Sequence, residues 1–328
     1  MNPPLLSARG LGVDFGLPGG RVARAVDGVD LDVASGEIVA LAGESGCGKT
    51  TLARALLGLE RATRGTIAFG GEPLRYSGRA LKSYRRDVQL ILQDPSGALN
   101  PRHTVYDAVA EGLRIHRIAD KETERVAEAL SRAGLRPPEK FFSSYPHELS
   151  GGQRQRAVIA GALVLRPNVI IADEPVASLD ASVRGEILAL LLRLRDEMDL
   201  GALVITHDLG LAWSIADRIA IMYLGRIVEQ GPVERVLTDP QHPYTRALVS
   251  VLPDSPLPEP MILSGELPDA ARIPSGCRFR PRCRAYASGS ASAVAGDCEG
   301  ADPGPLPSEA SAHRVACHLH RVERGAEP

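Results

Sequence analysis

The sequence predicts an α/β fold with a mixed or parallel sheet, because three short apolar runs have the length and composition of buried strands. These runs cover residues 38–42, 169–172 and 202–206, and glycine or polar residues follow each of them at once. Sheets of this kind bind their ligands beyond the carboxyl ends of the strands. The residues that follow the three runs are therefore the first candidates for a functional site.

Residues 43–50 read Gly-Glu-Ser-Gly-Cys-Gly-Lys-Thr, a complete phosphate-binding loop directly after the first strand. Its glycines let backbone N–H groups fold around phosphate oxygens, which a Cβ would obstruct. We expect Lys49 to reach the β- and γ-phosphates of a nucleoside triphosphate and Thr50 to bind Mg²⁺. A helix over about residues 49–58 would direct the positive end of its dipole at the phosphates. The predicted nucleotide-binding residues of this loop are Gly43, Glu44, Ser45, Gly46, Cys47, Gly48, Lys49, Thr50 and Thr51.

Cys47 lies inside this loop near a helix N-terminus, where the pKa of a thiol tends to fall. One interpretation is that alkylation or oxidation of this thiol inhibits the nucleotide site. We favour the other interpretation, in which a small side chain fills a spacer position.

Two carboxylates, Asp173 and Glu174, follow the second strand at the edge where ligands bind. We expect Asp173 to hold Mg²⁺ through water and Glu174 to orient and deprotonate an attacking water. His207, directly after the third strand, is expected to contact the γ-phosphate and to hold Glu174 and the water in place. Gln93 is predicted to be a further contact to Mg²⁺ and water.

A second anion site is predicted about a hundred residues after the phosphate-binding loop. Ser150 is a good N-cap for a helix expected over about residues 151–165. A capped helix N-terminus that contains two glycines binds anions through its free N–H groups. The residues of this stretch are Ser150, Gly151, Gly152 and Gln153.

The loop at 43–50 and the sequence Leu-Ser-Gly-Gly-Gln at 149–153 together resemble the ATP-binding cassette family. The resemblance covers residues from about 5 to 250. It implies an ATPase in which the stretch at 149–153 closes over the γ-phosphate bound to the opposite subunit. Asp180, in Ser-Leu-Asp, resembles the residue of the loop that links the two sites across that interface.

The same resemblance implies that the adenine base stacks on an aromatic side chain upstream of the phosphate-binding loop. Phe15 is the candidate, because the next aromatic residue in the sequence is Phe69. The alternative is that Phe15 is a strand residue packed on the core.

Composition narrows the class of protein further. A chain of 328 residues, 44% of them apolar, can bury a sizeable core and has room for about two domains. A net charge of −2 gives no overall attraction to nucleic acid or anionic lipid. No stretch approaches the roughly 20 consecutive apolar residues of a membrane span, and residues 1–10 lack a signal-peptide pattern. We therefore expect a cytosolic protein whose membrane contact goes through a partner.

Two domains are predicted. Residues 1–235 would form the nucleotide-binding domain, with a helical subdomain over about residues 95–165, where apolar residues recur at helical spacing. Residues 236–328 would form a C-terminal extension that is largely irregular, since Pro and Gly are frequent between 253 and 307.

Three stretches refine the resemblance: residues 145–148, 242–248 and 263–266, which read Tyr-Pro-His-Glu, His-Pro-Tyr-Thr-Arg-Ala-Leu and Leu-Ser-Gly-Glu. They are similar to the ATPases of bacterial oligopeptide and dipeptide importers. This implies a subunit at the cytoplasmic face of the cell membrane, with two permease subunits and a second, paralogous ATPase subunit as partners. A solute-binding protein outside the cytoplasm would act indirectly, and no nucleic acid is expected.

Two other functions stay open. Nickel-transporting relatives share the C-terminal resemblance, so nickel or another small solute is one alternative to peptides. A soluble cassette protein acting on ribosomes or DNA is less favoured, because such proteins usually carry two cassettes or a long coiled-coil insertion, and this sequence has one cassette and no sustained heptads.

The extension contains four cysteines, which a cytosolic protein is not expected to use as structural disulfides. Four thiolates suit a [4Fe–4S] cluster or Zn²⁺, and free thiols are a third interpretation. The surrounding sequences resemble those of importer ATPases that carry a cluster. They depart from that pattern in the 14 residues between the second and third cysteine, which are mostly small and are expected to loop out. The four are Cys277, Cys283, Cys298 and Cys317.

Overall fold

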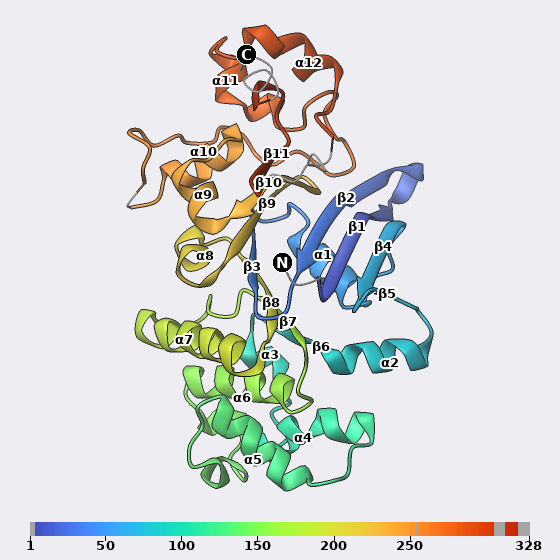
Figure 1. Cartoon of the computed structure of the whole chain (residues 1–328), viewed down its shortest axis with the longest axis vertical. Helices are drawn as coiled ribbons and strands as arrows, with labels where there is room; N and C mark the ends of the chain where they lie inside the picture. Colours follow the sequence, from blue (N-terminus) through green and yellow to red (C-terminus); the bar gives the residue numbers. More distant parts are fainter. Residues whose placement is uncertain (1–3, 254, 305–311, 321–328) are drawn as a thin grey trace. The chain divides into compact units, whose positions relative to one another are not determined.

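The computed structural model describes residues 4–253, 255–304 and 312–320 of the 328 residues. These residues form two compact units, each assembled from several segments of the chain. The first unit is centred on Ala68–Ile205 and also contains Asp32–Ile38. The second contains Ser7–Leu31, Val39–Ile67 and the described residues from Thr206 onward. Figure 1 labels the elements of both units.

Three parallel strands form the centre of the first unit: β6 (Val88–Ile91), β7 (Val169–Asp173) and β8 (Gly201–Thr206). Every residue of β7 before Asp173 is buried, as expected for a strand covered on both faces. The parallel pairing brings the carboxyl ends of β6 and β7 to the same edge, so residues that follow these two strands meet there.

Helices α4 (Val105–His116), α5 (Glu122–Arg132) and α6 (Gly151–Leu163) pack against one another in the first unit (Figure 1). The side chains of Val105, Val109, Leu113, Val126 and Leu130 are fully buried. These positions have the helical spacing that the sequence shows, so these segments are helical as that spacing indicates. The other helices of this unit are α2 (Gly78–Asp87), α3 (Pro95–Ala98) and α7 (Ala181–Met198).

The second unit contains a mixed set of strands. β3 (Ile38–Ala42) pairs in parallel with β9 (Arg218–Tyr223), and β9 pairs in antiparallel fashion with β10 (Arg226–Pro232). The β9–β10 turn has two residues, Leu224 and Gly225, both with positive φ (+42° and +81°), as a type I′ hairpin requires.

The C-terminal extension contributes its own strand to this unit. β11 (Arg314–Val315) pairs antiparallel with β10, with Val315 opposite Glu229 and Arg314 opposite Gln230. β2 (Val22–Val33), β1 (Leu6–Gly16) and β4 (Arg64–Phe69) are neighbours in that order in a separate sheet, and the end of β4 pairs with β5 (Glu72–Pro73).

The described residues from 255 to 276 lie outside any helix or strand, as expected from the Pro and Gly content of the extension. The 14-residue stretch between Cys283 and Cys298 is more ordered than a simple loop. It contains α11 (Arg284–Ala287), a 3-10 turn at Ser292–Val294 and the start of α12 (Ala295–Gly300). Alanines in this stretch favour helix, and small side chains allow tight turns.

The remaining helices of the second unit are α1 (Lys49–Leu56), α8 (Leu209–Ile215), α9 (Val233–Thr238) and α10 (Pro243–Ser250).

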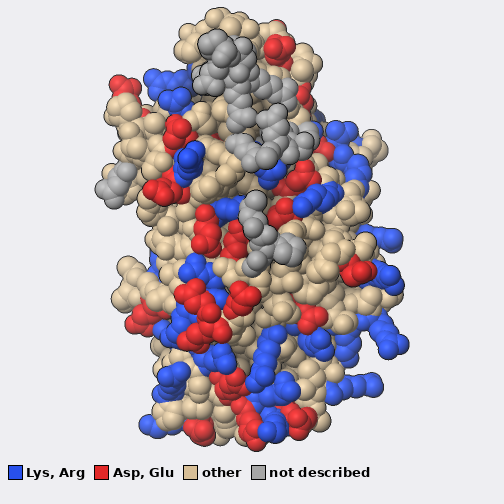
Figure 2. All heavy atoms as spheres, viewed as in Figure 1, with Lys and Arg blue, Asp and Glu red and all other residues tan. Residues whose placement is uncertain are grey.

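Within the described part of the chain, no helix is long and apolar enough to cross a membrane. Both signs of charge occur across the face drawn in Figure 2, in keeping with the small net charge of −2.

Candidate functional site

The phosphate-binding loop joins β3 to α1, which is the strand, turn and helix that the sequence predicts. Lys49 is buried, and its ammonium donates hydrogen bonds to the carbonyl oxygens of Gly43 (2.6 Å) and Glu44 (2.9 Å). Gly48 has φ +113°, and a Cβ there would lie 2.1 Å from the carbonyl oxygen of Ala25. Only glycine fits this position, so the loop geometry depends on it.

The remaining loop side chains differ in exposure. Ser45 and Thr50 are exposed, so their hydroxyls can reach a bound nucleotide or cation. Cys47 is buried, and burial raises the pKa of its thiol. This agrees with a spacer residue, because a buried, protonated thiol is a poor nucleophile.

Gln93 and Glu174 are brought together at the edge of the first unit's strands. The side-chain amide of Gln93 donates a hydrogen bond of 2.9 Å to Oε2 of Glu174. Glu174 follows β7 with φ +45°, and its N–H donates to the carbonyl oxygen of Ile205. A glutamate in the left-handed region is strained, and such strain concentrates at functional sites. Asp173 is half-buried at the end of β7.

The Ser-Gly-Gly-Gln stretch forms the predicted capped helix N-terminus, at the start of α6. Ser150 Oγ accepts from the N–H of Gln153 (3.2 Å), and Gln153 Oε1 accepts from the N–H of Ser150 (2.9 Å). Together these two bonds form a capping box. Ser150 and Gln153 therefore fix each other's side chains. Gly151 and Gly152 place no side chain over the first turn of α6, so its N–H groups can be approached by an anion.

Asp180 begins α7 next to this stretch. Its Oδ1 accepts from the N–H of Val183 (3.0 Å) and from the hydroxyl of Ser182 (2.7 Å), and these bonds lower the pKa of Asp180. A Cβ on Gly152 would lie 2.6 Å from Cγ1 of Val183. Glycine at 152 therefore lets α6 begin against the start of α7, and the two loops form one surface within the first unit.

The other two predicted residues belong to the second unit. His207 follows β8 and is exposed. Phe15 lies on β1 with 39% of its surface exposed, so it does not pack in the core, which was the alternative to base stacking. The first unit contains the other predicted site residues outside the phosphate-binding loop, which are Gln93, Asp173, Glu174, Asp180 and the capped N-terminus of α6.

The extension contacts the phosphate-binding loop, which the sequence did not lead us to expect. Arg282 donates from its two terminal nitrogens to the two carboxylate oxygens of Glu44, at 2.6 and 3.0 Å. The hydroxyl of Tyr244 accepts from the N–H of Glu44 at 2.9 Å. Tyr244 lies in the predicted stretch 242–248 and Arg282 directly precedes Cys283, yet no local pattern links either residue to a loop some 200 residues away.

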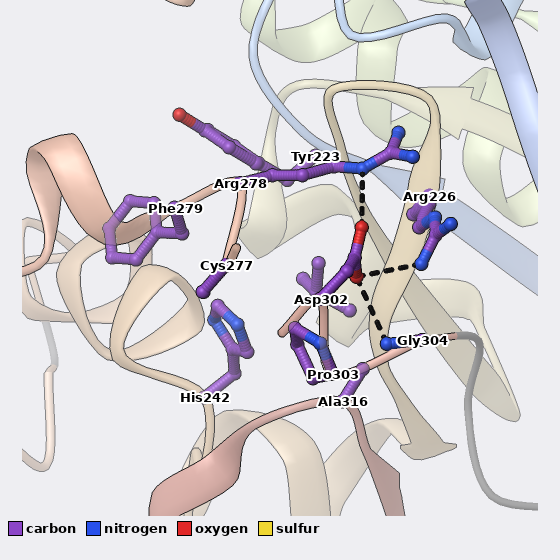
Figure 3. A pocket seen from close by; sticks show the side chains of 11 residues that line it. Tyr223, Arg226, His242, Cys277, Arg278, Phe279, Asp302, Pro303, Gly304 and Ala316 are labelled. Atoms are coloured by element: carbon purple, nitrogen blue, oxygen red, sulfur yellow. Dashed lines mark hydrogen bonds and ion pairs between the residues drawn. The ribbon is translucent and has the colours of Figure 1, made fainter. Parts of the chain in front are cut away.

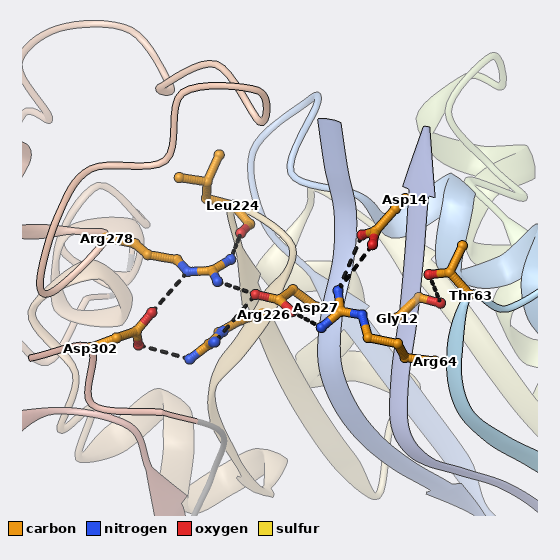
Figure 4. Close-up of polar contacts among 9 residues, drawn as sticks. All are labelled: Gly12, Asp14, Asp27, Thr63, Arg64, Leu224, Arg226, Arg278 and Asp302. Carbon is orange, nitrogen blue, oxygen red and sulfur yellow. Dashed lines mark hydrogen bonds and ion pairs between the residues drawn. The ribbon is translucent and has the colours of Figure 1, made fainter. Parts of the chain in front are cut away.

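A buried cluster of charged side chains attaches the extension to β2 (Figure 4). The carboxylate of Asp27 is 4% exposed and contacts Arg278, Arg226 (3.2 Å) and Arg64 (2.9 Å). Burial raises the pKa of Asp27, but the hydrogen bond and charge of Arg278, with Arg226 and Arg64, outweigh it and lower the pKa to about 2. Asp27 is therefore charged at any ordinary pH.

Asp302 closes this cluster from the side of the extension. It contacts Arg278 (3.2 Å) and Arg226 (2.7 Å), and Arg278 also donates to the carbonyl oxygen of Leu224 (2.8 Å) in the β9–β10 turn. Arg278 thus ties together β2, the hairpin turn and the extension.

The four cysteines of the extension line one pocket, together with His242 and His318. Figure 3 shows the adjacent pocket, which Cys277 and His242 also line. Burial, with a smaller contribution from neighbouring cysteines of the set, raises the pKa of Cys277 to about 11 and that of Cys317 to about 12. Among the residues that the structure describes, however, no three His, Cys, Asp or Glu side chains are arranged to hold a metal ion. The predicted iron–sulfur cluster is thus not supported by the geometry as it stands.

The α/β fold and the phosphate-binding loop at residues 43–50 define a P-loop nucleotide-binding protein. Residues 26–177 match the ABC transporter family, and residues 228–288 match the oligopeptide/dipeptide transporter C-terminal region. The chain is 44% identical over 275 residues to the oligopeptide transport ATP-binding protein OppF of Escherichia coli K12, covering 80% of this chain and 81% of that protein. It is 41% identical to the putative oligopeptide transport ATP-binding protein YkfD of Bacillus subtilis 168, covering 97% and 96%. The chain belongs to the ABC transporter family, as its motifs predicted.

Solved structures agree with this assignment. CbiO1 of Clostridium perfringens, described as part of the ABC transporter complex cbiONQ, superposes with a TM-score of 0.64 at 30% identity, covering 72% of this chain and 91% of that one. The ATP-binding cassette MJ0796, solved as a post-hydrolysis dimer with ADP and Pi, gives 0.62 at 28% identity, covering 70% and 98%. The predicted α/β cassette fold is confirmed.

Proposed function

We propose that this chain is the ATP-hydrolysing subunit of a peptide importer and works at the cytoplasmic face of the cell membrane. The observation that carries this proposal is the presence, in one chain, of a complete phosphate-binding loop and the oligopeptide/dipeptide transporter C-terminal region. Relatives named as oligopeptide and dipeptide transport ATP-binding proteins match 80% or more of the chain, which supports peptides as the solute.

The loop would bind the triphosphate of ATP. Lys49 supplies a fixed positive charge for the β- and γ-phosphates, and the exposed hydroxyl of Thr50 supplies one ligand to Mg²⁺. Asp173 would hold the same Mg²⁺ through water. Phe15, exposed on β1, would stack on the adenine.

Hydrolysis would depend on Glu174. Its carboxylate accepts the proton of the attacking water while Gln93, already hydrogen-bonded to it, keeps it oriented. Breaking the bond between the γ-phosphorus and the bridging oxygen leaves ADP and phosphate, and His207 would contact the γ-phosphate during this step. Positioning and charge stabilisation provide most of the acceleration in such reactions.

Each site would be completed by a second ATPase subunit. The capped N-terminus of α6 presents N–H groups and the positive end of a helix dipole, and this chain's own nucleotide does not require them. In the proposed dimer they bind the γ-phosphate held by the partner, and Asp180 links the two sites. ATP binding then closes the dimer and hydrolysis reopens it, which drives two attached permease subunits.

Co-purification tests this function. The tagged full-length chain is isolated from gently solubilised native membranes, and everything bound to it is identified by mass spectrometry. Two permeases and a second ATPase subunit support the importer. Peptide-stimulated ATP hydrolysis by that complex, with its solute-binding protein added, identifies the solute; stimulation by nickel instead would replace peptides with the alternative. Ribosomal proteins or DNA-repair factors without any membrane protein would overturn the proposal.

A [4Fe–4S] cluster on Cys277, Cys283, Cys298 and Cys317 is a second, separate proposal. It rests on the resemblance of the sequences around the four cysteines, whose side chains line one pocket although no three of them are arranged to hold a metal ion among the described residues. Bound there, a cluster would cross-link four segments of the extension, and binding would release protons because burial keeps these thiols protonated. Iron and sulfide analysis of anaerobically purified protein tests it, with absorbance near about 400 nm expected. Stoichiometric zinc, or four free thiols without metal, would contradict it.

A further inference from the structure

Glu44, the second residue of the phosphate-binding loop, is held by two residues of the C-terminal extension. Arg282 binds both oxygens of its carboxylate, and the Tyr244 hydroxyl binds its backbone N–H. The three residues belong to the same compact unit. Glu44 is therefore fixed at its side chain and at its backbone by contacts from outside the cassette core.

Arg282 is itself tightly placed. Its side chain is only 5% exposed, its Nε donates to the carbonyl oxygen of Ser264 (3.2 Å), and its guanidinium lies 6.0 Å from the centre of the Tyr223 ring. Its two hydrogen bonds to Glu44 form the parallel, two-pronged arrangement that is the strongest geometry for an arginine and a carboxylate. Lysine cannot reproduce that arrangement.

Tyr244 is equally constrained. It is fully buried in α10, and its ring packs against Tyr223 and Phe279 at centroid distances of 4.8 and 5.5 Å. Phe279 lies between Cys277 and Arg282 in the extension. The aromatic packing thus fixes the Tyr244 hydroxyl relative to the segment that carries Arg282.

These contacts act on the part of the loop that meets the triphosphate. The carbonyl oxygen of Glu44 accepts a hydrogen bond of 2.9 Å from the Lys49 ammonium, so a shift of Glu44 shifts the surroundings of Lys49. The Glu44 carboxylate is also a negative charge beside a polyanion site, and an unpaired carboxylate there would repel ATP. Arg282 neutralises this charge.

We propose that Arg282 and Tyr244 are positioning residues of the ATP site, so that nucleotide affinity depends on the C-terminal extension as well as on the cassette. Arg282 neutralises and orients Glu44, and Tyr244 fixes the backbone at the start of the loop. This inference rests on the proposed function, because it assumes that the loop binds ATP.

The test measures MgATP affinity of the full-length chain by fluorescent-nucleotide titration, together with its thermal unfolding. We expect Arg282→Gln to weaken binding about tenfold, because an unpaired carboxylate remains in the loop. The MgATP affinity of Arg282→Lys should lie between that of Arg282→Gln and that of wild type. Tyr244→Phe should weaken MgATP binding a few-fold. In the double variant Glu44→Gln/Arg282→Gln the isolated charge is gone, so affinity should return to within about threefold of wild type.

Asp302→Asn is the matched control. It removes contacts to Arg226 and Arg278 in the same extension without touching the loop, so it should leave affinity within about twofold even where it lowers the melting temperature. The inference would be overturned if Asp302→Asn and Arg282→Gln weakened MgATP binding equally. It would also be overturned if Arg282→Gln bound MgATP as tightly as wild type, or if the double variant did not recover its affinity. If Arg282→Gln does not fold, the MgATP affinities of Arg282→Lys and Tyr244→Phe test the inference instead, and wild-type affinity in both variants would overturn it. Wild-type protein that fails to bind MgATP would instead refute the proposed function.

Discussion

The side-chain amide of Gln93 donates a 2.9 Å hydrogen bond to the carboxylate of Glu174, across 81 residues of sequence. The contact joins the end of β6 to the end of β7, and it holds a carboxylate whose backbone is in the left-handed region. Because an amide N–H donor orients a carboxylate without protonating it, the pair suits a base whose orientation matters.

Glu174→Gln should therefore remove steady-state hydrolysis while ATP binding persists. General-base catalysis contributes roughly 10²- to 10⁴-fold, so a loss of at least about a hundredfold in kcat is expected. ATP should then hold the variant as a stable dimer, visible by size-exclusion chromatography. Glu186→Gln, at an exposed carboxylate paired with Arg156, is the control and should hydrolyse ATP normally. Normal turnover by Glu174→Gln would exclude it as the base.

Lys49→Ala should lose nucleotide affinity. The ammonium is the loop's fixed cation, and charge-assisted hydrogen bonds of this kind correspond to roughly ten- to hundredfold in binding. Equilibrium binding of MgATP is the measurement, with Lys121→Ala, an exposed lysine at the start of α5, as the comparison. Unchanged binding by Lys49→Ala would count against the assignment of this loop.

Asp27→Asn should strongly destabilise the fold. Removing the charge leaves the buried guanidinium of Arg278 with the carboxylate of Asp302 but without that of Asp27, and breaking a buried pair in this way costs about 3–5 kcal/mol. Urea unfolding measures it, and Asp14→Asn, which removes only a contact to the half-exposed Arg64, should cost less than about 1 kcal/mol. The pKa of Asp27 lies at about 2 rather than 3.8, so its stabilisation is complete above pH 3.8 and is lost as the pH falls through 2. Equal stability of the two variants would show that the cluster does not hold the extension.

His242 should make stability depend on pH between 4 and 6.5. Burial lowers its pKa from 6.5 to about 4 despite the nearby carboxylate of Glu229, so the unfolded chain takes up a proton in this window and the folded chain does not. Stability therefore falls as the pH drops from 6.5 to 4, by on the order of 3 kcal/mol from this residue. His242→Asn keeps an acceptor for the N–H of Tyr244 at the start of α10 and should flatten this dependence. An unchanged slope in the variant would exclude His242 as its source.

Cys47 should resist alkylation. It is 1% exposed, and burial raises the pKa of its thiol, so the thiolate is scarce at neutral pH. Mass spectrometry after timed iodoacetamide treatment at pH 8 should show Cys283, which is partly exposed, modified well before Cys47. Modification of Cys47 first, with loss of ATP binding, would restore the interpretation of a reactive thiol.

The local elements of this protein could be predicted from its sequence because their signals are local. The strand at 38–42 is apolar throughout and is followed by Gly43, and the structure has β3 at Ile38–Ala42. The helix after Ser150 begins at Gly151 as expected, but ends at Leu163 rather than near 165. Both ends of a helix are defined only to within one or two residues, so this difference lies within that range.

The contacts of the extension could not be predicted in this way. Arg282 and Glu44 are 238 residues apart, and neither residue type nor spacing indicates that they meet. The helices between Cys283 and Cys298 were also missed, because a stretch of Ala, Ser and Gly carries no apolar periodicity. The roles assigned to Glu174, His207 and Phe15 stay predictions, which the experiments above address.

The two-residue strand β11 has a consequence for any shortened form of this protein. Because it pairs with Glu229 and Gln230 of β10, it shields hydrogen-bonding groups that would otherwise form an open sheet edge. A chain cut after the cassette would present that edge to other molecules as a template for intermolecular strand pairing. We therefore expect removal of β11 to promote self-association, so a shortened chain should be judged by its solubility as well as by its activity.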